Sequence, residues 1–196
     1  MQRPLDSASP EERRRASQRF VSEDKSKVSA VSSRARLRLF IILTALVITA
    51  DQLSKLWINA NRPQTALVPG FLDLVYVRND GAVFGLFHNH VVIFIVLSFI
   101  ASIAILALLY YFPPVTNVGA IAFALIFSGI VGNLIDRIRL GYVIDFIAFH
   151  VHELFRWPAF NVADAALVVG VFTLIYYFYR WGASRKSHER GLKPQS

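Results

Sequence analysis

Residues 91 to 112 read VVIFIVLSFIASIAILALLYYF, a run of 22 residues without one charged side chain. An α-helix rises about 1.5 Å per residue, so about 20 apolar residues cross the hydrocarbon layer of a membrane. The run is too long for a buried strand, and it lacks the polar face of an amphipathic helix. It therefore predicts a transmembrane helix.

Three further apolar segments are long enough to cross a membrane, and they set the fold class. They cover about residues 37 to 58, 117 to 135 and 164 to 181. Apolar residues fill these segments in unbroken runs, which is typical of contact with lipid. We predict an all-α membrane protein of four transmembrane helices, with both termini on the same side.

The basic residues predict which side that is. The chain carries 21 Lys and Arg against 13 Asp and Glu, a net charge of +8. Ten of the basic residues lie in residues 1 to 38 and five in 180 to 196, whereas the first and third connections hold two and three. Lys and Arg are retained on the cytoplasmic side. We expect cytoplasmic termini and two outward-facing loops.

The domain boundaries follow from the same patterns. Residues 1 to 36 are polar and basic and offer little to bury, so we expect a disordered cytoplasmic tail. The tail either attracts anionic lipid headgroups or serves only as a topology signal. Residues 37 to 181 form the transmembrane domain, and residues 182 to 196 a second basic cytoplasmic tail. The first apolar run has no small-residue cleavage site after it, so we expect it to stay in the membrane.

Polar residues from four separate segments gather at the outward membrane face of this topology. Charged residues in or near a bilayer are costly and usually mark function. The set comprises Asp51, Lys55, Asn79, Asn133, Asp136, Arg137, Asp145, Asn161 and Asp164.

Asp51 and Lys55 lie four residues apart, on one face of the first helix, where a carboxylate pairs well with an ammonium. The pair is either a structural anchor of the helix end or a support for the site. A directly catalytic Asp51 is the weaker interpretation.

The sequence of the first outer loop predicts a β-hairpin. Residues 68 to 70 read as a turn and residues 72 to 77 as a strand. An Asn-Asp-Gly turn follows, in which Asn79 hydrogen-bonds a peptide substrate or belongs to a plain surface hairpin.

The end of the third helix combines small and polar residues. Gly129 and Gly132 allow close helix packing in lipid. Asp136 beside Arg137 favours a charge-assisted pair at the helix end, and Asn133 is placed to reach a substrate backbone.

Two carboxylates in different surroundings complete the set. Asp145 lies in the apolar segment 142 to 147, which disfavours its charged form. Asp164 lies at the start of the fourth helix, where the dipole favours the ionised form. Asn161 and Asp164 also match a helix-capping pair. Carboxyl groups with pKa values pushed apart suit general acid and base chemistry.

The sequence lacks the motifs of other kinds of hydrolase. The chain has no cysteine, no His-Glu-x-x-His run, no Gly-x-Ser-x-Gly elbow and no P-loop. The spaced histidines of the outer loops (His88, His90, His150 and His152) fit surface positions better than a metal site. We expect no metal and no cofactor.

Five ordered motifs within residues 37 to 181 resemble those of lipoprotein signal peptidase, or signal peptidase II. They are Asp51-Gln52-Leu53-Ser54-Lys55, Arg78-Asn79-Asp80-Gly81-Ala82-Val83-Phe84, Gly132-Asn133-Leu134-Ile135-Asp136-Arg137, Val143-Ile144-Asp145-Phe146 and Phe160-Asn161-Val162-Ala163-Asp164.

The resemblance implies a membrane aspartic endopeptidase that cleaves diacylglyceryl-modified prolipoproteins just before the lipidated cysteine. It implies a small β-like cradle from the first outer loop, a site at the periplasmic face of the inner membrane, and inhibition by globomycin-like cyclic peptides. We expect a monomer with no nucleic-acid partner. The implied roles are catalysis for Asp145 and Asp164, substrate binding for Asn79, Asn133, Arg137 and Asn161, and support for Asp51, Lys55 and Asp136.

Two other function classes compete with a peptidase. Acids inside a membrane also mark the proton relays of transporters, although these acids gather at one face and do not thread the midplane. A noncatalytic membrane scaffold would use the same aspartates as helix caps.

Overall fold

The computed structural model describes residues 10 to 81, 91 to 151 and 155 to 191. Its helices are α1 (Pro10–Asn61), α2 (Val91–Tyr111), α3 (Asn117–Leu140) and α4 (Val162–Gly191). Each contains a stretch long and apolar enough to cross a membrane. The prediction of four transmembrane helices is confirmed.

The helices α1 and α4 are longer than expected. We expected residues 1 to 36 to be disordered, yet α1 already begins at Pro10, and α4 runs on to Gly191. The early part of α1 is rich in Arg, Lys, Glu and Ala, which favour helix, and proline suits a first turn. A helix nucleated by the membrane span extends into such residues at little cost. Residues 1 to 9 and 192 to 196 lie outside the described residues.

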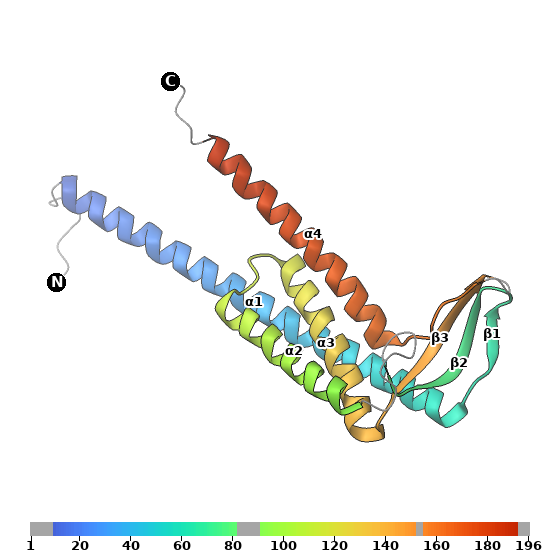
Figure 1. Cartoon of the computed structure of the whole chain (residues 1–196). Coiled ribbons are helices and arrows are strands. Elements are labelled where there is room, and N and C mark those ends of the chain that lie inside the picture. Colours follow the sequence, from blue (N-terminus) through green and yellow to red (C-terminus); the bar gives the residue numbers. More distant parts are fainter. Residues whose placement is uncertain (1–9, 82–90, 152–154, 192–196) are drawn as a thin grey trace.

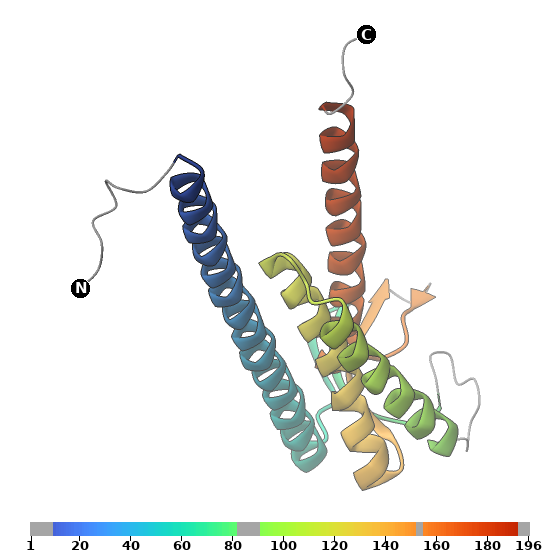
Figure 2. The same ribbon diagram turned by 90° about the vertical axis from the view of Figure 1, so that its left-hand side faces the viewer.

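The helix α3 is the centre of the bundle and contacts the other three helices. Figures 1 and 2 show it between α1, α2 and α4, while the far ends of α1 and α4 extend beyond it and diverge. Small residues permit this close packing: a Cβ added at Gly129 would lie 2.5 Å from the carbonyl oxygen of Ala163 on α4. The small-residue prediction for Gly129 and Gly132 therefore agrees with the α3–α4 contact.

A small antiparallel sheet extends beyond one end of the helices (Figure 1). Its strands, in spatial order, are β1 (Thr65–Val68), β2 (Leu72–Asn79), β3 (Val143–Val151) and β4 (Phe155–Arg156). The turn at residues 68 to 70 and the strand from Leu72 are as predicted. The prediction drew the cradle from the first outer loop alone, but β3 and β4 come from the second outer loop.

The strand β3 escaped prediction because it is apolar on both faces and lacks strand alternation. On one face, Ile144 and Phe146 pack against Ile58 of α1. On the other face, Val143, Asp145 and Phe149 line a cavity. The register pairs Asn79 with Val143 and Val77 with Asp145, which brings Asn79 beside Asp145.

Gly129→Ala is expected to destabilise the bundle by about 1–3 kcal/mol, because the added methyl group meets backbone atoms of α4 that cannot move unless the helices separate. The measurement is the midpoint of thermal unfolding in detergent. Ile138→Ala on the same helix is the matched control, since Ile138 is 61% exposed and should stay within about 0.5 kcal/mol of the parent. Equal midpoints for both variants would contradict close α3–α4 packing.

Candidate active site

A cavity of about 1030 Å³ lies between the sheet and helices α2, α3 and α4. Its wall is mostly apolar, with side chains such as Phe71, Phe94, Phe149, Leu167 and Val168. Five of the predicted site residues also line it: Asn79, Asn133, Arg137, Asp145 and Asp164. A large apolar cavity with a few convergent polar groups is the usual form of a ligand site.

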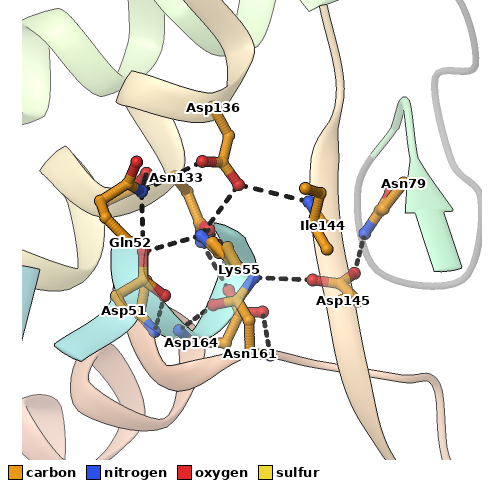
Figure 3. Close-up of polar contacts among 12 residues, drawn as sticks. Asp51, Gln52, Lys55, Asn79, Asn133, Asp136, Ile144, Asp145, Asn161 and Asp164 are labelled. Atoms are coloured by element: carbon orange, nitrogen blue, oxygen red, sulfur yellow. Dashed lines mark hydrogen bonds and ion pairs between the residues drawn. The ribbon is translucent and has the colours of Figure 1, made fainter. Parts of the chain in front are cut away.

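Asp145 projects from β3 into this wall and is held by two amides (Figure 3). Its Oδ2 accepts a hydrogen bond from Asn79 Nδ2 at 2.8 Å, and its Oδ1 accepts one from Asn161 Nδ2 at 2.7 Å. Burial raises the pKa of the Asp145 carboxyl to about 7, and the charge of nearby Asp164 acts in the same direction. The two amide hydrogen bonds oppose this shift without cancelling it.

Asp164 stands in the first turn of α4 and is fixed by a capping box. Asn161 Oδ1 accepts from the backbone N–H of Asp164 at 2.9 Å, and Asp164 Oδ2 accepts from the backbone N–H of Asn161 at 3.2 Å. The other carboxylate oxygen accepts from Asn133 Nδ2 at 2.7 Å. The capping interpretation of this pair is therefore correct. It leaves Asp164 on the cavity wall.

Asn133 and Asn161 join the two aspartates into one network. Asn133 Oδ1 accepts from both Lys55 Nζ and Asn161 Nδ2, at 3.0 and 3.1 Å. Because the ammonium only donates, the oxygen of Asn133 must face Lys55 and its NH₂ group must face Asp164. Along this series of hydrogen bonds, the orientation of one side-chain amide thus fixes the orientation of the next.

Lys55 is 2% exposed and donates to three acceptors from two helices (Figure 3). Its Nζ lies 2.8 Å from Asp51 Oδ2, 3.0 Å from Asp136 Oδ2 and 3.0 Å from Asn133 Oδ1. An ammonium has three donors, so its hydrogen-bonding capacity is filled. The predicted ion pair of Asp51 and Lys55 is present, with a second carboxylate added to it.

The two carboxylates around Lys55 also accept hydrogen bonds from the backbone of the segments that carry Asp145 and Asp164. Asp51 Oδ1 accepts from the N–H of Ala163 in the first turn of α4, at 2.9 Å. Asp136 Oδ2 accepts from the N–H of Ile144, next to Asp145, at 3.3 Å. Asp51 and Asp136 thus contact the segments that carry Asp164 and Asp145, and the supporting role predicted for Asp51, Lys55 and Asp136 stays a prediction.

Gln52 belongs to this network, and the sequence analysis gave it no role. Its Nε2 lies 3.1 Å from Asp51 Oδ2, 3.1 Å from Asp136 Oδ1 and 3.2 Å from the carbonyl oxygen of Gly132. The sequence signal that could have predicted this role is the position of Gln52 beside Asp51 in an apolar helix, because a buried amide needs hydrogen-bond partners.

One predicted contact differs. We expected Asp136 to pair with the adjacent Arg137, but Asp136 faces Lys55 and Gln52. The guanidinium of Arg137 instead lies 5.2 Å from the ring centroid of Phe94 and lines the cavity. Consecutive residues of a helix point about 100° apart, so the side chains of Asp136 and Arg137 face different parts of the protein.

The histidines do not form a metal site in the described part of the chain, where no group of three potential ligands is found. His150 Nε2 lies 2.9 Å from Asp73 Oδ2, on the sheet. His88, His90 and His152 lie outside the described residues, as do residues 82 to 84 of the second motif.

Comparison with known protein families identifies the family of this chain. The family model described as Signal peptidase (SPase) II matches residues 43 to 180, more than half of the chain. The chain belongs to the signal peptidase II family. The family resemblance drawn from the five motifs is confirmed, and the chain is a multi-pass membrane peptidase.

Curated proteins and solved structures agree with this membership. The lipoprotein signal peptidase of Moorella thermoacetica is 39% identical over 158 residues, covering 79% of this chain and 99% of the relative. That of Syntrophotalea carbinolica is 41% identical over 154 residues, covering 76% and 95%. A solved bacterial membrane enzyme, determined by the in meso method at 2.3 Å, has a TM-score of 0.63 and 27% identity, covering 80% of this chain and 94% of that one.

Lys55→Met is expected to destabilise the protein by about 3–5 kcal/mol, because Asp51 and Asp136 would stay buried without their cation. The midpoint of thermal unfolding in detergent measures this loss. The triple variant Asp51→Asn, Lys55→Met, Asp136→Asn removes all three charges and should recover part of the stability. A single variant as stable as the parent would contradict the role of the ion cluster.

Proposed function

We propose that Asp145 and Asp164 are the catalytic pair of an aspartic endopeptidase that removes the signal peptide of diacylglyceryl-modified prolipoproteins, cleaving just before the lipidated cysteine. One observation carries the proposal. Two carboxylates from different elements line the same apolar cavity, and amides orient both of them. Such a cavity strengthens electrostatic interactions with a reacting group, and the fixed amides need no rearrangement during reaction.

The reaction needs one proton on the pair and one water molecule. The ionised carboxylate takes a proton from the water as its oxygen attacks the scissile carbonyl carbon, while the protonated carboxyl gives its proton to the carbonyl oxygen. The tetrahedral intermediate collapses as one member of the pair gives its proton to the amide nitrogen, the other member takes a hydroxyl proton from the intermediate, and the C–N bond breaks. The pair again holds one proton, and the products are a new carboxyl terminus and the free amino group of the cysteine.

The high pKa of Asp145 suits it to hold the shared proton near neutral pH. A coupled pair titrates as a unit, so the proton belongs to both carboxyl groups together. Amide donors on both members allow either to stand ionised during the cycle.

The apolar wall suits a substrate that arrives from the membrane. Phe94, Leu167 and Val168 belong to membrane-spanning stretches of α2 and α4 and line the cavity beside the acids. In our proposal the acyl chains lie against these helices, and their binding energy positions the scissile bond. Asn79, Asn133 and Arg137 contact the substrate backbone from the cavity wall. Asn161 was also predicted to bind substrate, but it is fully buried and does not line the cavity, so its role in our proposal is to orient Asp145 and Asp164.

The proposed orientation places both termini in the cytoplasm and the cavity at the outer face of the inner membrane, as the distribution of basic residues favours. We further propose that a globomycin-like cyclic peptide occupies the same cavity.

The decisive assay presents the purified protein in detergent with a diacylglyceryl-modified prolipoprotein, beside an unlipidated copy. We expect the parent to shorten only the lipidated substrate. Asp145→Asn and Asp164→Asn should each reduce cleavage by about 10²-fold to 10⁴-fold, because each removes a general acid or base. Gel shift measures the cleavage.

Asp73→Asn is the matched control, since Asp73 is a sheet aspartate that contacts His150 and does not line the cavity. It should leave cleavage near the parent rate. If folded parent protein leaves the lipidated substrate intact, the proposed reaction is wrong. If both catalytic variants cleave normally, the pair is misassigned, and Asp164 serves only in its capping box with Asn161.

The cleavage rate is expected to fall as pH rises above about 7. The pKa of Asp145 is raised to about 7, so the pair keeps its shared proton below this value and loses it above. A pair with both carboxylates ionised has no proton to give to the carbonyl oxygen. The measurement is kcat/KM against pH from about 5 to 9, with thermal unfolding followed in parallel to exclude loss of fold. A flat profile across pH 7 would contradict the assignment.

A further inference from the structure

A second group of charged and aromatic residues lies apart from the aspartates, and no step of the proposed reaction uses it. Two tyrosines of the sheet region hydrogen-bond each other, with 3.4 Å between Tyr76 OH and Tyr142 OH. The guanidinium carbon of Arg78 lies 3.9 Å from the ring centroid of Tyr142, and that of Arg62 lies 5.1 Å from the ring centroid of Tyr76. We call these four residues the arginine–tyrosine cluster.

The cluster belongs to the face of the sheet that turns away from Asp145. Tyr76 and Tyr142 pack with Ile58 and Ile144, whereas Asp145, the next residue of β3, lines the cavity. Successive side chains of a strand point to opposite faces. Arg78 alone touches both regions, because it also borders the cavity.

The stacking orders both arginines while leaving their donors available. A guanidinium over an aromatic ring uses its face, and its N–H groups at the edge still bind oxygen anions. Both arginines are exposed, and in the described part of the chain neither forms an ion pair with a carboxylate. The cluster is therefore an ordered site of positive charge.

The backbone at Arg62 adds an independent observation. Arg62 follows the last residue of α1 with φ +45°, and its N–H donates to the carbonyl oxygen of Ile58 at 2.8 Å. This is the left-handed helix cap at which glycine is favoured and a larger residue is strained. An arginine at a position that favours glycine points to a use for its side chain.

The position of the cluster matches the depth of lipid headgroups. The candidate membrane-spanning helix of α1 runs to Asn61, directly before Arg62. One turn earlier, Trp57 is 54% exposed, as is typical of a tryptophan at a membrane interface. At this depth the abundant anions are the phosphate groups of phospholipids.

We propose that Arg62 and Arg78, held on the Tyr76–Tyr142 pair, bind the phosphate of an anionic membrane phospholipid beside the mouth of the substrate cavity. The guanidinium edges donate to the phosphate oxygens, and the glycerol and acyl chains follow the exposed side of α1. The bound lipid occupies a site separate from Asp145 and Asp164, so the proposal does not depend on the proposed reaction.

Fluorescence quenching by brominated lipids tests the proposal without any activity assay. Trp157→Phe and Trp181→Phe leave Trp57, five residues before Arg62, as the single tryptophan. The protein is placed in bilayers of phosphatidylcholine that contain brominated phosphatidylglycerol or brominated phosphatidylcholine. We expect tighter association of phosphatidylglycerol at Trp57, by about fivefold for each arginine.

Three variants sharpen the test. Arg62→Gly should remove about half of the preference on a logarithmic scale while keeping or raising the unfolding midpoint, because glycine suits the left-handed cap. Arg62→Gly with Arg78→Gln should abolish the preference. Arg38→Gln, which removes an exposed arginine from the same helix on the far side of its apolar stretch, should leave the preference unchanged.

Equal quenching by the two brominated lipids in the parent would overturn the proposal, as would a preference that survives in the double variant. The source of the phosphate is tested by adding inorganic phosphate. If a few millimolar abolishes the preference, the cluster takes free phosphate and the lipid assignment is wrong. A preference that persists supports a lipid headgroup.

Discussion

The buried ammonium of Lys55 is the contact on which the rest of the site depends. Its three donors are used by Asp51, Asp136 and Asn133, so one group links α1 to α3. The two carboxylates extend this link to the backbone of α4 and β3, through Ala163 and Ile144. Removing two carboxylates from water is costly without such compensation, which explains why the charges occur together.

The same contact sets the electrostatic difference between the cluster and the aspartates in the cavity. Asp51 and Asp136 each face the cation directly and share the Gln52 amide. Asp145 and Asp164 are held by neutral amides and line an apolar wall, and burial there raises the pKa of Asp145 to about 7. One region of the protein thus contains two carboxylates that face a cation and two that face amides and an apolar cavity, and our proposal assigns the proton transfer to the second pair.

The sheet forms one wall of the cavity. In our proposal it also carries part of the phospholipid site. Its cavity face carries Asp145 and Asn79, while Tyr76 and Arg78 of β2 stack with Arg62 and Tyr142 beside its opposite face. Because successive side chains of a strand point to opposite faces, the β2–β3 pair places a carboxylate and an amide on one face and a stacked arginine and tyrosine on the other. Substrate and membrane lipid would then meet the same sheet from opposite faces.

The sequence by itself determined the four spans, the gathering of acids and amides at one membrane face, and the capping pair of Asn161 and Asp164, because apolar length, charge placement and spacing are local properties. Tertiary structure alone decided the rest. It paired β3 with β2, turned Asp136 toward Lys55, drew Gln52 into the network and placed Asn79 beside Asp145. These contacts join residues distant in sequence, and their partners depend on how helices and strands pack, which no local pattern records.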